Sequence, residues 1–380
     1  MKLRCHEMNI AVIGAGIGGL TTAALLIEQG HDVTVFEKKT QITELAAGIG
    51  IGDNVIQKLA GHDLAKGILN HGQEMEGMFI RSAEGHKLTK MMFRKKTMNV
   101  TLLRQTLVDL IASYVPETAI RFATKVQRVE NTADGVTVHT EADSTAFDLC
   151  IGADGIHSNV RQTVAPKSKV LYQGYTCFRG VVDDVNLKYD NFAYEYWGKA
   201  GRFGIVPMLD GRVYWFATIN AKEHDAKYQN FAKPHLQAYF NHFPAYVRQV
   251  LDQQDESTIL HHDIYDLKPL STFVYGHTIL LGDAAHATTP NMGQGAGQAM
   301  EDAIVLAQCL AHYPVEKALA RYDRLRVKHT KKVIKKSRSI GKKAQYQNGL
   351  KVRVRNTVLK RVPKWMINRQ NKFIFKSKVK

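Results

Sequence analysis

The sequence contains little cysteine. Four cysteines occur in 380 residues, at Cys5, Cys150, Cys177 and Cys309. They lie far apart and form no CxxC pair, which argues against a zinc site or a disulfide framework and suits a reducing, cytoplasmic setting. The 16 histidines show no metal-ligand spacing either. The sequence therefore predicts no metal site.

Long apolar runs are also missing. No stretch of about 18 apolar residues occurs, so the sequence predicts no membrane-spanning helix. Lys2 and Arg4 precede an apolar run, as they would in a secretory signal peptide. We reject that interpretation because the run contains a complete nucleotide-binding pattern, which cleavage would destroy.

Acidic residues are nearly absent from the end of the chain. Residues 321–380 contain 22 Lys and Arg and one acid, Asp323, for a net charge of +21. The other 320 residues hold 30 bases and 34 acids, for a net charge of −4. The body of the protein is therefore mildly acidic, and the overall charge of +17 belongs to a tail.

The stretch from Asn9 to Lys38 has the order of a dinucleotide-binding unit. Gly14 allows a tight turn, Gly16 lets a pyrophosphate approach the backbone, and Gly19 lets the helix pack close to the strand. Glu37 is placed to accept hydrogen bonds from a ribose diol. The pattern predicts strand, glycine turn, helix, second strand and acid, over Asn9–Ile13, Gly14–Gly19, Leu20–Gln29, Asp32–Phe36 and Glu37.

Two later strands also lead into an acid and glycines. Phe147–Ile151 precedes Asp154 and Gly155, and Thr278–Leu281 precedes Asp283. The loop from Pro290 to Gly297 then contains Gly293, Gly295 and Ala296 and opens a helix. Ligands bind at the carboxyl ends of strands in open sheets, and anions bind at helix N-termini. An ordinary glycine-rich connection is a poor explanation for all three sites together.

Two further positions are candidates for ligand contact. Gly48 lies in the glycine-rich segment 47–52, which either lines a cofactor site or is a flexible loop. Arg104 lies in the first turn of a helix predicted over Thr101–Tyr114, where a base opposes the helix dipole and therefore favours a bound anion. The alternative for Arg104 is a solvated helix face.

The pattern changes to β alternation rich in aromatic residues from Val170 to Asn220, with a hairpin turn at Asp210-Gly211. We predict an α/β fold: a Rossmann-like nucleotide domain with an inserted antiparallel-sheet substrate domain and a C-terminal helical basic tail. The predicted bounds are 1–75, 96–168 and 276–335 for the nucleotide domain, 76–95 and 169–275 for the substrate domain, and 336–380 for the tail.

The three motifs together resemble the FAD-dependent aromatic-ring hydroxylases, the single-component flavoprotein monooxygenases. The matching segments are GAGIGG with Glu37, DLCIGADGIHSNVR over 148–161, and GDAAHATTPNMGQGAGQAMEDA over 282–303. The resemblance covers residues 8–340. It implies FAD, with its ADP half held by the first motif, its phosphate or ribityl chain reached by Arg104 and Asp283, and its ring above the Pro290–Gly297 loop. Asp154 and Gly155 belong to a segment shared with the pyridine nucleotide.

The resemblance also implies the chemistry. NAD(P)H would reduce FAD, O2 would form a flavin C4a-hydroperoxide, and one oxygen would pass to a small aromatic or heterocyclic substrate. The protein must exclude water, and the aromatic sheet is expected to supply apolar walls. Two alternatives stay open: a flavin reductase or oxidase that inserts no oxygen, and a membrane-recruited flavin redox protein.

Arg202 and Tyr214 are the candidate substrate-contacting, catalytic residues. Their spacing resembles that of an Arg and a Tyr in urate-hydroxylating members, where Arg pairs with an anionic or carbonyl group and Tyr donates a hydrogen bond. The alternative is a pair of residues flanking a hairpin turn. Asn291 stands where those members carry Asp, which argues against urate; salicylate-hydroxylase-like members more often carry Asn there. His286 is expected to be structural.

The basic tail has three interpretations. It is a helical cap packed on the nucleotide domain, an anchor on an anionic membrane surface, or, least favoured because no recognition fold accompanies it, a nucleic-acid-binding segment. A long helix is predicted over Leu319–Ala344. Beyond Gly349, bases alternate with apolar residues that include Trp365 and Phe373.

Overall fold

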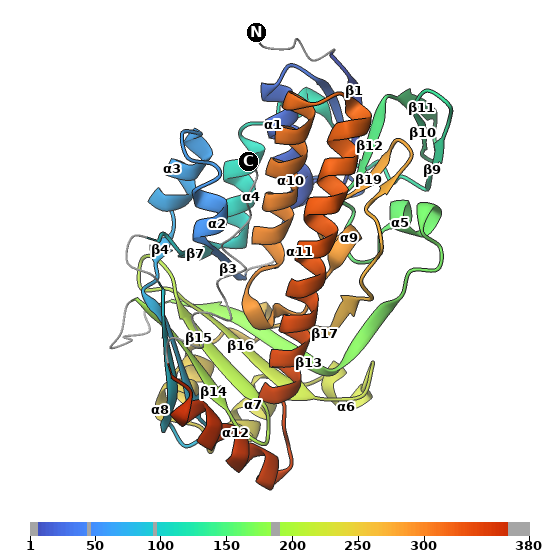
Figure 1. Ribbon diagram of the computed structural model, residues 1–380. Coiled ribbons are helices and arrows are strands. Elements are labelled where there is room, and N and C mark those ends of the chain that lie inside the picture. Colours follow the sequence, from blue (N-terminus) through green and yellow to red (C-terminus); the bar gives the residue numbers. More distant parts are fainter. Residues whose placement is uncertain (1–6, 44–46, 94–96, 184–190, 364–380) are drawn as a thin grey trace.

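The computed structural model describes residues 7–43, 47–93, 97–183 and 191–363 (Figure 1). Two large sheets dominate it. A six-stranded sheet with helices packed on it forms one half of the molecule, and a seven-stranded sheet forms the other half. The predicted α/β fold with an inserted sheet and C-terminal helices is confirmed.

The six-stranded sheet has the order β18-β19-β12-β1-β2-β8, and all its pairs are parallel except β18–β19. Ile10 to Ile13 are at most 4% exposed, which explains the unbroken apolar run of a strand covered on both faces. The strands are β1 (Asn9–Ile13), β2 (Asp32–Phe36), β8 (Ile120–Arg121), β12 (Leu149–Gly152), β18 (Val274–Tyr275) and β19 (Thr278–Leu280).

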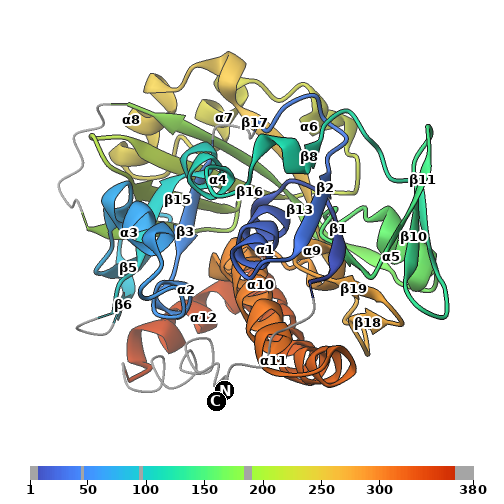
Figure 2. The same cartoon turned by 90° about the horizontal axis from the view of Figure 1, so that it is seen from above.

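Helices α1 (Ile17–Glu28), α10 (Gly295–His312) and α11 (Val315–Ala344) pack side by side, as Figures 1 and 2 show. Helix α1 begins at Ile17, earlier than predicted, because extended Gly16 is its N-cap and the glycine motif forms its first turn. The prediction of helix from Thr101 was wrong. Residues 100–103 form strand β7, and α4 (Arg104–Ala112) begins at Arg104.

Smaller elements complete the nucleotide-domain side. A three-stranded sheet β3-β7-β4 lies beside the cavity described below, and a second one, β11-β10-β9, lies outside the main sheet. Their bounds and those of the neighbouring helices are β3 (Gly48–Ile51), β4 (Gln73–Glu74), β7 (Val100–Leu103), β9 (Arg128–Asn131), β10 (Val136–His139), β11 (Ser144–Phe147), α2 (Asp53–Ile56), α3 (Asp63–Asn70), α5 (Asn159–Val164), α9 (Asp283–His286), η1 (Glu117–Ala119) and η3 (Pro290–Met292).

The seven-stranded sheet has the order β17-β13-β16-β15-β14-β5-β6. It is antiparallel as predicted, except that β14 and β5 pair in parallel. The helix predicted over Pro234–Gln254 is two helices, because Pro244 is the N-cap of the second. The elements are β5 (Gly77–Ser82), β6 (Lys87–Met92), β13 (Val170–Val182), β14 (Phe192–Trp197), β15 (Arg202–Pro207), β16 (Val213–Asn220), β17 (Leu260–Leu267), α6 (Ala226–Gln229), α7 (Lys233–Tyr239), α8 (Ala245–Gln253) and η2 (Glu256–Thr258).

Most aromatic residues of this sheet lie on its outer face. They form a core with α7 and α8 that includes Phe178, Tyr194, Tyr196, Phe203 and Trp215. Because side chains alternate along a strand, the inner face receives their neighbours in sequence, several of them charged. The sheet nevertheless gives the cavity mostly apolar walls, as expected, and Arg179, Glu195 and Arg202 are the charged side chains that these strands add to the lining.

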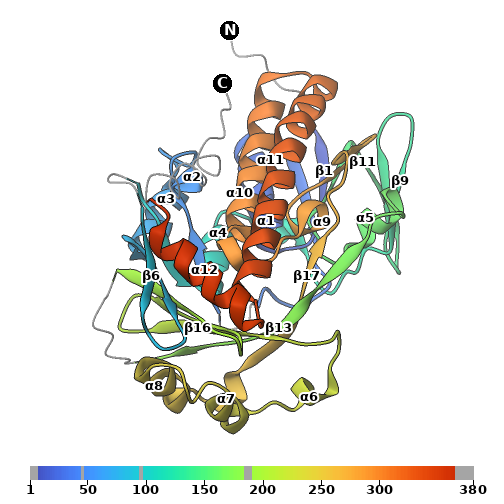
Figure 3. The same ribbon diagram turned by 60° about the horizontal axis from the view of Figure 1, so that its bottom comes forward.

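Helix α11 continues through the boundary predicted at residue 335, and helix α12 (Gly349–Arg361) crosses to the β6 edge of the seven-stranded sheet (Figure 3). Arg355 fixes α12 there: its guanidinium lies 5.4 Å from the Trp197 ring and donates to the carbonyls of Lys343 and Ala344 at 3.1 Å. None of the described helices is long and apolar enough to cross a bilayer. Trp365 and Phe373, the aromatic residues named in the predicted tail, lie outside the described residues.

Candidate active site

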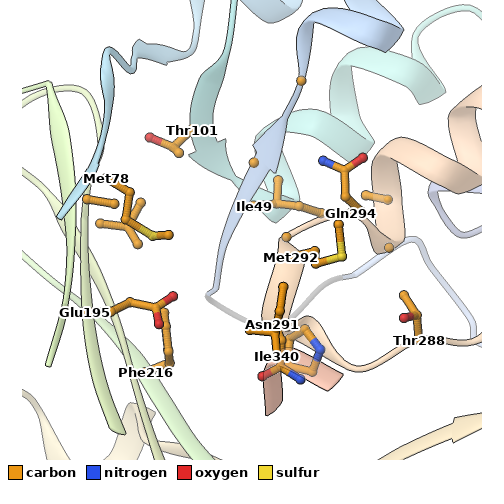
Figure 4. A pocket seen from close by; sticks show the side chains of 18 of the residues that line it. Ile49, Met78, Thr101, Glu195, Phe216, Thr288, Asn291, Met292, Gln294 and Ile340 are labelled. Carbon is orange, nitrogen blue, oxygen red and sulfur yellow. The ribbon is translucent and has the colours of Figure 1, made fainter. Parts of the chain in front are cut away.

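A cavity of about 1330 Å³ lies between the two large sheets. It runs from the glycine turn after β1, past β3, α4 and α9, to the inner face of the seven-stranded sheet and to α12. In Figure 4, Met78, Glu195 and Phe216 come from the sheet, and Asn291, Met292 and Ile340 come from the opposite wall. Of the predicted site residues, the cavity wall contains Gly16, Gly48, Arg104, Gly155, Arg202, Tyr214, Asp283, Pro290, Gly293, Gly295 and Ala296.

The remaining four predicted residues, Gly14, Gly19, Glu37 and Asp154, lie behind this wall. Gly14 has φ +103°, and a Cβ on Gly19 would lie 1.9 Å from the Gly14 carbonyl oxygen, so both positions require glycine. Glu37 accepts hydrogen bonds from the backbone N–H of Ala15 at 2.8 Å and of Lys39 at 2.9 Å. The carboxylate thereby holds the turn that presents Gly16 to the cavity.

Asp154 also supports the backbone. Its Oδ2 accepts a hydrogen bond from the Val160 N–H at 3.2 Å, at the start of α5. Burial raises the pKa of Asp154, and hydrogen bonds from Ser158 and Val160 partly oppose that rise. In this structure the neighbouring Gly155, rather than the Asp154 carboxylate, lines the cavity.

Asp283 is a carboxylate deep in the protein that is nevertheless exposed to the cavity. Burial raises its pKa, and the positive charges of His286, Arg104 and Arg161 partly oppose the rise. Arg161 is 2% exposed and donates to the Ala284 carbonyl at 3.1 Å. Asp283 and Arg104 therefore line the same stretch of the cavity wall.

The Pro290–Ala296 segment forms the cavity wall at the start of α10. Gly293 has φ +58° after the short η3 helix, and Gln294 is the N-cap of α10. A Cβ added at Gly293 or Gly295 would meet nothing within 4 Å. Backbone N–H groups of this helix N-terminus therefore lie beside open space, which suits a bound group that carries negative charge.

Asn291 points its amide nitrogen away from that space. Nδ2 donates to Tyr175 Oη at 3.0 Å, Thr289 Oγ1 at 2.8 Å and the Ser337 carbonyl at 3.1 Å. A backbone carbonyl only accepts, so the position facing Ser337 requires a donor. Asn291 Oδ1 has no hydrogen-bond partner among the described residues.

Two arginines lie on the sheet face of the cavity. Arg202 is 2% exposed, and no hydrogen-bond acceptor meets its Nε or Nη1 among the described residues. Its nearest carboxylate oxygen belongs to Glu195, at 3.6 Å from Nη1. Glu195 is already the acceptor of the Trp197 indole N–H at 2.7 Å. Arg179, for which no role was predicted, lines the same wall from β13.

Tyr214 lies between this sheet and β3. A Cβ on Gly48 would lie 2.5 Å from Tyr214 Cβ, so the glycine allows the close contact. Burial raises the pKa of Tyr214 to about 12, although Arg179 opposes the rise. The phenol therefore keeps its proton at neutral pH and can donate a hydrogen bond. The structure brings Arg202 and Tyr214 to one cavity wall.

A buried charge network lies behind the cavity wall and was not predicted from the sequence. Asp302 accepts from the Gly282 N–H at 2.9 Å, from His286 Nε2 and from Arg326 Nε, while Glu301 pairs with Lys58 and Arg326. Burial would raise both acid pKa values, but these cations hold them at about 2. The sequence feature that could have indicated the network is the pair of adjacent acids, Glu301 and Asp302, inside the Ala-rich helix α10. His286 is 3% exposed and lies in this network, as a structural role requires.

The residues present fit an extended dinucleotide. A Cβ at Gly16 would meet nothing within 4 Å, so the turn leaves open space next to the α1 N-terminus. Asp283 and Arg104 lie further along the cavity, and the α10 N-terminus follows. Among the described residues, no group of three His, Cys, Asp or Glu could hold a metal ion.

Comparison with known proteins supports this geometry. A family model described as "FAD binding domain" matches residues 7–337. An aurachin C monooxygenase/isomerase of Stigmatella aurantiaca is 34% identical over 361 residues, 93% of this chain and 94% of the relative. A 2-heptyl-3-hydroxy-4(1H)-quinolone synthase of Pseudomonas aeruginosa is 29% identical over 366 residues, 94% of each protein. Klebsiella pneumoniae HpxO, solved with FAD and uric acid, is 27% identical, with a TM-score of 0.89 over 98% of both chains.

Proposed function

Since the chain belongs to the FAD-dependent aromatic-ring hydroxylases, we propose which of its residues hold FAD and which hold the substrate. The adenosine end is held at Gly14, Gly16, Gly19 and Glu37. Further along, Gly48, Arg104, Asp154, Gly155 and Asp283 hold the central part. The ring lies against Pro290, Gly293, Gly295 and Ala296. The observation that carries the assignment is that one continuous cavity is lined by nine of these residues, from Gly16 to Ala296. Gly14, Gly19, Glu37 and Asp154 act from behind the wall, by holding the backbone that lines it.

When bound, FAD supplies the activation of O2 with electrons from NAD(P)H, the reductant of this family. The chain contributes charge and position. The N–H groups at the start of α10 stabilise negative charge beside them. Asp283 and Arg104 orient the bound group through opposite charges, and the enclosing sheet restricts water.

The substrate is proposed to be an aromatic or heteroaromatic ring with an anionic or carbonyl oxygen. Arg202 and Arg179 carry two positive charges on the sheet face, with Glu195 as the neighbouring acid. The protonated Tyr214 adds a hydrogen-bond donor. The relatives' names include a quinolone and uric acid, which are rings of this chemical kind. An arginine that stabilises a ring oxygen as its anion makes the ring carbons more electron-rich, which favours attack on an electrophilic oxygen.

The test measures flavin, reductant and product together. Purified protein should show a flavin spectrum or acquire one with FAD. A panel of quinolones, urate, salicylate and other hydroxybenzoates should include a compound that accelerates NAD(P)H oxidation and gains one oxygen by mass. H2O2 formation with no oxygenated product from any compound would favour an oxidase, and a protein that never binds FAD would overturn the proposal.

We also propose that the basic outer side of α12 contacts an anionic membrane surface. Arg353, Lys360 and Arg361 are exposed on this helix and do not line the cavity. Each basic residue close to an anionic surface contributes about 1 kcal/mol. Vesicles containing phosphatidylserine should therefore sediment the protein at low salt, and vesicles of phosphatidylcholine alone should not.

A charge-reversed variant gives the control for this test. Replacing Arg353, Lys360 and Arg361 by Glu should abolish sedimentation. Replacing the exposed residues Lys125, Lys167 and Lys222 by Glu changes the net charge equally and should preserve it. Equal loss in both variants would show that overall charge, rather than α12, is responsible.

A further inference from the structure

The cavity changes in character across the seven-stranded sheet. Arg179 lies on β13 and Arg202 on β15, whereas the inner face of the last two strands carries Met78, Ile80 and Met91. Strands β15 and β6 are three strand spacings apart, roughly 14 Å at the usual spacing. The sheet face of the cavity is therefore charged at one end and apolar at the other.

Helix α12 extends the apolar end. Leu350, Val354 and Val358 recur every four residues, line the same cavity, and are 71%, 56% and 51% exposed. Met92 on β6 also lines it and is 40% exposed. Large apolar side chains left open along one stripe mark a surface that binds an apolar group.

The position of α12 is fixed, so this stripe is a built wall. Arg355 is 5% exposed and binds the carbonyls of Lys343 and Ala344, and Leu359 packs against the cluster of Ile80 and Leu88. The stripe therefore faces the cavity mouth and continues the surface that begins at Met78 and Met91.

We propose that the substrate carries an apolar chain on its oxygen-bearing ring, and that the chain lies between α12 and strands β5 and β6. This inference rests on the proposed function, since the ring must occupy the arginine end of the cavity. Because the stripe is continuous with that site, the occupant it fits best is the remainder of the same ligand. The methionines suit chains of varied shape, because their side chains are flexible.

The experiment uses the FAD-loaded, full-length protein and a series of 4-alkylphenols from phenol itself to octylphenol. Dissociation constants are measured by the change in flavin fluorescence. Each buried methylene should tighten binding about fourfold until the groove is filled. Replacing Val354 and Val358 together by Gln should remove this gain for octylphenol and leave the binding of phenol unchanged.

Thr357→Gln is the matched control, because Thr357 is exposed on the same helix and does not line the cavity. It should retain the full dependence on chain length. A flat series in the FAD-loaded protein, or a V354Q/V358Q variant that behaves as the parent, would overturn this inference and leave the proposed function intact. Failure to bind FAD would instead overturn the proposed function. If the double variant loses only vesicle binding, the stripe is a membrane contact and the inference fails.

Discussion

At the cavity wall, whether a side-chain atom donates or accepts a hydrogen bond determines which residue a position can hold. Asn291 shows this most clearly, since its amide nitrogen faces three acceptors, one of them the Ser337 carbonyl. Aspartate has almost the same shape but would place an oxygen against that carbonyl. Urate-hydroxylating members carry Asp where this chain has Asn291. The difference therefore concerns the hydrogen-bond donor needed beside the Ser337 carbonyl as well as the choice of substrate.

Asn291→Asp should lower stability by about 1–3 kcal/mol, the cost of unpairing a buried polar group. Urea denaturation of the FAD-loaded protein measures it. Asn241→Asp is the control, because that side chain is exposed and Arg248 bonds the backbone carbonyl of this residue rather than its amide. Equal midpoints for both variants would contradict the assigned orientation of Asn291.

Arg202 is predicted to act on substrate affinity and orientation. Arg202→Gln removes a charge-assisted donor from the cavity wall, worth about 1.5–3 kcal/mol. We expect roughly a 10- to 100-fold fall in kcat/KM with FAD content unchanged. Arg212→Gln, at the hairpin turn of the same sheet and outside the cavity, should have little effect. An unchanged kcat/KM in the Arg202 variant would exclude this role.

At the scale of elements, one arginine couples three of them. Arg326 on α11 is 1% exposed and neutralises Glu301 and Asp302 on α10, and Asp302 binds the turn that starts α9. Helix α11 therefore determines the position of the Asp283 backbone without approaching the cavity there. Both acids are fully buried, so each needs a nearby cation. The charge of Arg326, in addition to packing, therefore determines how these helices fit together.

Arg326→Met should destabilise the protein by about 3–5 kcal/mol, because it leaves two buried acids with fewer cations. It should also weaken FAD binding, since the Gly282–Asp283 turn loses its support. Arg324→Met is the control on the same helix, because Arg324 is exposed. Thermal unfolding and FAD titration measure the two effects. A variant as stable as the control would show that the network adds nothing net.

Local patterns could be predicted from the sequence, and contacts between distant elements could not. The turn at Gly14–Gly19 depends on residues close together in the chain, so its role was evident. The aromatic alternation indicated a sheet, but which face meets the cavity depends on α7 and α8 covering the other. Arg326 and Asp302 are 24 positions apart on two helices, and Val354 reaches the cavity only because the chain turns after α11.

The whole molecule should lose stability on acidification in two steps that follow from its buried groups. Burial, together with the charge of Arg326, lowers the pKa of His329 from 6.5 to about 4. The unfolded chain therefore binds a proton below pH 6.5 that the folded chain refuses until about pH 4, which costs on the order of 3 kcal/mol over that window. Glu301 and Asp302, held at about 2, add a second loss between about pH 4 and pH 2. His329→Gln should make the first step smaller without removing it, because burial also lowers the pKa of His31, His261 and His262. The second step should be preserved in urea denaturation at successive pH values. The exposed His157→Gln variant should keep both steps. A His329→Gln profile that still falls between pH 6.5 and 4 as steeply as the parent would show that other groups bind those protons.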